Sequence, residues 1–85
     1  MSPTPVSAPH DPSFEPLIAA TGLPETIAMG VLRRALKDTG GKEPPSKADW
    51  TRALPRIEAR MRAYVGEPVA KERAKLVAAT IATLP

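Results

Sequence analysis

The 85-residue chain has no cysteine, no asparagine and no glutamine, and it has a single histidine. The lack of cysteine excludes disulfides, thiolate nucleophiles and cysteine-based metal sites. The lack of asparagine and glutamine removes the side chains that commonly read adenine edges in DNA. His10, the sole histidine, lies in a proline-rich stretch apart from any catalytic set, so we expect it to be solvated.

Combinations of residues that carry catalysis are also missing. The sequence has no pair of carboxylates in an apolar setting, no Ser/His/Asp set and no metal-ligand cluster. Gly40 and Gly41 followed by Lys42 come nearest to a phosphate-binding loop. They follow a predicted helix rather than a strand, which is more typical of a helix stop. We therefore expect no enzymatic activity, no metal and no cofactor.

Long apolar runs are absent, so no membrane span is expected, and the N-terminus lacks the basic start and apolar stretch of a signal peptide. These features predict a cytoplasmic protein with no membrane partner. The net charge of +3 is unevenly distributed: residues 1–30 carry three acidic and no basic side chains, whereas residues 31–85 carry all twelve basic residues and six acidic ones. This division suggests a basic side that faces a partner.

Proline is abundant, and four of the eleven prolines lie in the first twelve residues. Each proline removes a backbone donor and restricts the residue before it, so neither helix nor strand is expected there. We predict a flexible Pro-rich N-terminal tail over residues 1–12 and a helical domain over residues 13–85. The fold class is predicted to be all-α, a compact bundle of four short helices, because apolar residues recur at helical spacing and no alternating strand pattern is found.

Residues 46–65 form the predicted centre of the core. Their apolar side chains recur at helical spacing and include the only Trp and the only Tyr of the chain. Ser46 and Asp49 predict a capping box at the start of this helix. Pro55 predicts a kink or a break, and the unbroken apolar spacing favours a kink. The residues expected to face the core are Trp50, Leu54, Ile57, Met61, Tyr64 and Val65.

Two helices are predicted before this segment. The first covers residues 13–21, with Ser13 as its N-cap, and Gly22 can take the left-handed conformation that ends it. The second covers residues 24–39, and Pro24 suits its first position because the missing N–H has no helical partner there.

A fourth helix is predicted over residues 68–83. The tract from residue 76 to residue 85 carries no charge and is too short for a membrane span, so we expect it to be core or interface. The inward-facing side chains are predicted to be Val69, Arg73 (through its stem), Leu76, Val77, Ile81 and Leu84.

The two helices before the central segment are joined by the turn Thr-Gly-Leu-Pro at residues 21–24. This arrangement, over residues 17–38, is similar to the helix-turn-helix of the IclR-type winged repressors, in which glycine sits in the turn and the second helix enters the major groove. The resemblance implies a DNA-binding transcriptional regulator, although no strand pair follows to form a wing. The alternative is a tight turn between two core helices. Carried over position by position, the groove-reading residues would be Glu25, Thr26, Met29 and Gly30.

Two groups of basic residues are the remaining candidates for function. Arg52, Arg56 and Arg60 recur every four residues on the side of the third helix away from Trp50, and Arg56 and Arg60 lack an acidic neighbour on their own helix. A similar patch is expected on the second helix. The predicted partner-binding residues are Arg33, Arg34, Lys37, Arg52, Arg56 and Arg60.

From these patterns we predict a non-enzymatic protein–protein interaction module, a small adaptor or regulator. Its basic helix face would bind an acidic protein surface. A homodimer is an alternative partner arrangement, and nucleic acid is an alternative ligand through the turn at Gly22. An ordinary solvated face is the plain alternative to both.

Overall fold

Helical segments follow one another along almost the whole described chain. The computed structural model describes residues 12–42 and 45–84, which contain four α-helices and no strand. The predicted all-α fold of four helices is therefore confirmed. The predicted tail, residues 1–12, lies outside the described residues apart from Pro12. The helices are α1 (Phe14–Thr21), α2 (Glu25–Asp38), α3 (Lys47–Val65) and α4 (Glu67–Ala82).

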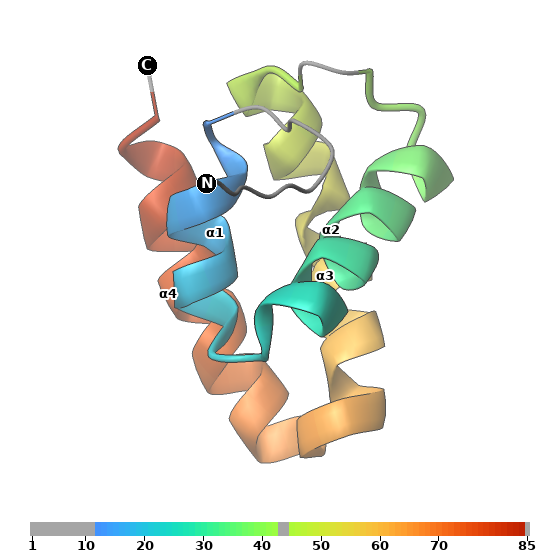
Figure 1. Ribbon diagram of the computed structural model, residues 1–85, viewed down its shortest axis with the longest axis vertical. Coiled ribbons are helices and arrows are strands. Elements are labelled where there is room, and N and C mark those ends of the chain that lie inside the picture. Colours follow the sequence, from blue (N-terminus) through green and yellow to red (C-terminus); the bar gives the residue numbers. More distant parts are fainter. Residues whose placement is uncertain (1–11, 43–44, 85) are drawn as a thin grey trace, which may run out of the picture.

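The four helices pack in a closed ring around one apolar core. α1 contacts both α2 and α4, and α3 contacts the same two helices. In Figure 1, α1 lies along α4, and α2 crosses in front of α3. Each helix contributes one stripe of side chains to the core, as the apolar spacing predicted. The largest apolar side chains without solvent exposure are Phe14, Leu17, Leu32, Trp50, Ile57, Met61 and Val77.

The indole of Trp50 lies at the centre of this core and is fully buried. Its ring meets that of Phe14 edge to face, with centroids 5.1 Å apart and an interplanar angle of 80°. Its Nε1 donates a hydrogen bond of 3.0 Å to the Ser13 hydroxyl, so its one polar atom is satisfied. Ser13 occupies the predicted N-cap position of α1, but its side chain makes no capping hydrogen bond, and its hydroxyl accepts the indole proton instead.

The start and the middle of α3 follow local rules. The predicted capping box is present, because the Ser46 hydroxyl accepts from the Asp49 amide at 3.1 Å and the Asp49 carboxylate accepts from the Ser46 amide at 2.9 Å. The helix continues without interruption through Pro55, so it does not break there. The proline is exposed to solvent, where water can satisfy the carbonyl that loses its helical donor.

Arg73 of α4 contacts the turn between α1 and α2. Gly22 has a φ of +70°, as its predicted left-handed role requires. Nη1 of Arg73 donates a hydrogen bond of 2.6 Å to the Thr21 carbonyl, and a Cβ at Gly22 would lie 1.7 Å from that nitrogen. Pro24 has an extended backbone and precedes the first helical residue, so it is the N-cap rather than the predicted first residue of α2.

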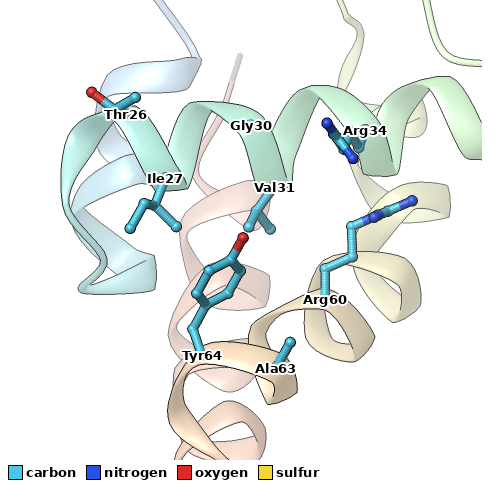
Figure 2. A pocket seen from close by; sticks show the side chains of 8 residues that line it. All are labelled: Thr26, Ile27, Gly30, Val31, Arg34, Arg60, Ala63 and Tyr64. Carbon is cyan, nitrogen blue, oxygen red and sulfur yellow. The ribbon is translucent and has the colours of Figure 1, made fainter.

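Three side chains predicted to face the core are exposed instead: Tyr64 at 57%, Leu76 at 55% and Val69 at 38%. The buried stripe of α4 consists of Ala70, Ala74, Val77 and Ile81, and Val69 and Leu76 lie one residue, or about 100° around the helix, from it. Tyr64 is in register with the buried stripe of α3, but its ring rises beside α2 and is only partly covered there (Figure 2).

Candidate functional site

The six predicted partner-binding residues differ in the groups that they contact. Arg60 of α3 reaches Asp38 at the end of α2, and Arg34 of α2 lines the same cleft as Arg60. The positive charges of Arg34 and Arg56 also act on the Asp38 carboxylate. The sequence predicted one patch on α2 and another on α3. Because α2 packs on α3, Arg34 of the α2 patch and Arg60 of the α3 patch line one cleft. We call these three arginines together with Asp38 the α2–α3 basic cluster.

Arg60 is the best-held member of this cluster. Its Nη2 donates to the Asp38 carboxylate at 2.6 Å, and the two side chains keep about one third of their surface exposed. Arg60 lacks an acidic neighbour on α3, as its spacing indicated, but Asp38 of α2 supplies an acidic partner. Its Nε is buried and has no hydrogen-bond partner within the described residues.

Asp38 titrates at a lower pH than an ordinary aspartate. The hydrogen bond from Arg60 is the main cause that lowers the pKa of the Asp38 carboxyl, and the positive charges of Arg60, Arg56 and Arg34 lower it further, against an opposing effect of desolvation. Asp38 is therefore ionised at neutral pH. One carboxylate stands against three guanidinium groups, which leaves the cluster with a net charge of +2 (three minus one).

The other predicted residues have contacts outside the α2–α3 basic cluster. Arg52 is paired with Asp49 on its own helix at 2.5 Å, which leaves it little charge to offer a partner. Arg33 and Lys37 line a separate shallow depression of about 300 Å³, together with Leu36 and Gly41. The guanidinium of Arg33 also lies over the ring of Phe14, with its carbon 5.7 Å from the ring centroid, in a cation–π contact.

A cleft of about 320 Å³ opens between α2 and α3 beside the basic cluster. Figure 2 shows Ile27 and Val31 projecting from α2 toward α3, the ring of Tyr64 rising from α3, and the two arginines at one end. The cleft thus combines an apolar interior with a cationic end. The lining residues are Thr26, Ile27, Gly30, Val31, Arg34, Arg60, Ala63 and Tyr64.

Sequence reasoning did not find this cleft. Tyr64 was expected in the core because of its spacing, and Gly30 was considered among the DNA-reading residues that the resemblance implies. One available signal was the glycine itself, since a glycine inside a helix lowers helix stability relative to alanine and calls for a reason.

The residues that the helix-turn-helix resemblance would assign to DNA reading are only partly accessible. Glu25 and Thr26 are exposed, whereas Met29 is half-buried against the core and Gly30 lies in the cleft. The helix, turn and helix are present at the expected places. Residues 12–42 and 45–84 contain no strand, so this part of the chain has no wing of the kind found in those repressors.

No group of three or more metal-ligating side chains is close enough to hold an ion in the described part of the chain. In that same part, no helix has the length and apolarity of a membrane span. Comparison with known proteins finds no match, whether among protein-family models, curated proteins or solved structures.

Proposed function

We propose that this protein is a non-enzymatic interaction module, an adaptor or regulator, that binds an acidic protein surface through the α2–α3 basic cluster. The observation that carries the proposal is that Arg34 and Arg60 line one cleft and that the single carboxylate of Asp38 faces the positive charges of Arg34, Arg56 and Arg60. Exposed charges contribute little to folding, whereas an excess of one sign speeds the encounter with a surface of the opposite sign. The cluster therefore suits association better than stability.

The proposal narrows the set of residues that contact the partner. Arg34 and Arg56 are the central pair, because both are exposed and neither is hydrogen-bonded to an acid within the described residues. Arg60 orients the cluster through Asp38. Arg33 and Lys37 form a second, flanking site around their own depression. Arg52 is the least suited of the six, since Asp49 neutralises it.

A homodimer is the second partner arrangement, and a different surface favours it. Leu76 is 55% exposed on the half of α4 that carries no charge. It borders a shallow depression of about 430 Å³ between α1 and α4, lined by small or apolar groups such as Pro16, Ala20 and Ala79. Two copies that met through this face would keep their basic clusters free for an acidic partner.

The test compares two charge reversals of equal size. Arg34→Glu with Arg56→Glu alters the basic cluster, and Lys71→Glu with Lys75→Glu alters exposed lysines of α4. Each pair changes the net charge by −4, from +3 to −1, so only the location differs. The binding partner is first captured with the native chain, identified and purified. Association rates are then measured for the native chain and both variants.

We expect the association rate to fall about tenfold at low salt for the arginine pair, with a smaller change for the lysine pair, and the difference to shrink at high salt. Equal rates for the two variants would refute the proposal. A random-sequence DNA duplex provides the contrasting ligand. Steeply salt-dependent binding to the duplex, lost in the arginine pair, would favour the nucleic-acid alternative instead.

A further inference from the structure

Gly30 is a helix-interior glycine that the fold does not need. Its φ is not positive, and a Cβ placed on it would meet no atom within 4 Å. Neither backbone conformation nor packing therefore requires glycine, although glycine weakens a helix relative to alanine. In contrast, Gly22 is required by both its φ and the contact with Arg73. The space above Gly30 is part of the α2–α3 cleft, so the missing side chain keeps the cleft open.

The cleft wall opposite Gly30 is an aromatic ring in contact with water. Tyr64 is 57% exposed, and it is the most exposed of the large apolar side chains in the described residues. Tyrosine and arginine are the residue types that most often anchor protein interfaces. Figure 2 shows the Tyr64 ring standing beside Val31, with Ile27 on its other side. A volume of about 320 Å³ is at the lower limit for ligand pockets, which suits one inserted side chain rather than a cofactor.

One end of the cleft has arginine N–H donors without an acceptor in the described residues, and such donors can bind an anion. Arg34 has no hydrogen-bond or salt-bridge partner within the described residues, and it lies at the end where Arg60 enters from α3 (Figure 2). Nη2 of Arg60 already donates a hydrogen bond to Asp38. Nε of the same guanidinium is buried and has no acceptor within the described residues. A carboxylate placed at this end would receive a bidentate pair of hydrogen bonds from Arg34, next to the positive charge of Arg60.

The spacing along α2 indicates the form of the partner. Gly30 and Arg34 are four residues apart, or about 6 Å along the helix axis. Side chains at positions i and i+4 of a second helix have the same separation. Gly30 also permits the close backbone approach that a helix lying along α2 would make.

From these observations, and resting on the proposed function, we propose that the α2–α3 cleft is the anchor site for an acidic helix of the partner protein. One large apolar side chain of that helix enters the cleft over Gly30, against Tyr64. A carboxylate one turn along the same helix pairs with Arg34 and Arg60.

Three short capped alanine-based helical peptides test this site on the isotope-labelled full chain by NMR titration. The first carries Leu at one position and Glu four residues later. The second replaces this Glu with Gln, and the third replaces the Leu with Ala. We expect the first peptide to shift the amides of Gly30 and Tyr64 and to bind about tenfold more tightly than either control. Equal binding of the three, or shifts confined to other surfaces, would overturn the inference.

Substitutions in the protein separate binding from folding. Gly30→Ala is expected to raise the midpoint temperature of thermal unfolding and to weaken binding of the first peptide about tenfold. Gly30→Leu is expected to abolish binding of this peptide. Arg34→Ala should weaken binding of the same peptide about tenfold, whereas its control Lys71→Ala, at an exposed lysine of α4, should not. A stabilised Gly30→Ala protein with unchanged peptide affinity would overturn the inference.

The two proposals fail in different ways. If Arg34→Glu with Arg56→Glu slows association with the purified partner but the peptides do not enter the cleft, the interaction module stands and the anchor site falls. If the charge reversal has no effect on the partner, the proposed function fails whatever the peptides do.

Discussion

Gly22→Ala is expected to destabilise the protein by about 2–4 kcal/mol through two separate effects. The first is conformational, because an alanine at a φ of +70° costs about 1–2 kcal/mol. The second involves Arg73, whose Nη1 lies 1.7 Å from where the new Cβ would stand. The guanidinium is the end of a flexible side chain and can move away cheaply, but it then gives up its hydrogen bond to the Thr21 carbonyl. For a half-buried charged donor we take this loss as about 1–2 kcal/mol.

A double-mutant cycle measured by urea unfolding separates these effects. Arg73→Met removes the hydrogen bond and keeps an apolar stem, so Gly22→Ala in that background should cost only the conformational part, about 1–2 kcal/mol. The coupling between the two sites should then be about 1–2 kcal/mol. The reasoning is refuted if Gly22→Ala lowers the free energy of unfolding equally in both backgrounds, since Arg73 would then contribute nothing to the loss. It is also refuted if Gly22→Ala is neutral alone.

Three other changes test the core, the charge pairs and the cleft. Trp50→Ala should cost about 3–5 kcal/mol by removing a fully buried indole, and circular dichroism should show an unfolded chain; a folded variant would place Trp50 outside the core. The pKa values of Asp38 and Asp49 are lowered in the fold, so their contributions to stability are present above about pH 4 and are lost as pH falls through the folded pKa values. Urea midpoints should therefore drop on acidification, and less steeply for Asp38→Asn. Gly30→Ala should stabilise by about 0.5–1 kcal/mol in the same assay, and a loss of stability would mean that the glycine is required by the fold.

The candidate site was only partly predictable. The sequence singled out Arg56 and Arg60 as basic residues without an acidic neighbour on their own helix, and it placed Arg34 in a separate patch on the second helix. In the fold, Arg34 and Arg60 line the same cleft. The sequence could not assign Arg60 to Asp38, which lies twenty-two residues earlier and on another helix. Ion pairs within one helix follow from spacing alone, as Arg52 with Asp49 shows, whereas pairs between helices depend on how the helices pack.

The helices themselves were determined by the sequence, because their limits depend on groups only a few residues apart. Ser46 and Asp49 satisfy each other's amides across three residues, and the glycine at position 22 ends α1 through its own φ. Tertiary structure decided which faces are covered. Tyr64 has the spacing of a core residue, yet it borders an open cleft because α2 presents Gly30 there rather than a side chain that would fill it. Likewise, the Ser13 hydroxyl bonds to the indole of Trp50, thirty-seven residues away, instead of capping its own helix. Local hydrogen bonds fix where a helix begins and ends, but burial depends on neighbours that only the packed chain brings together.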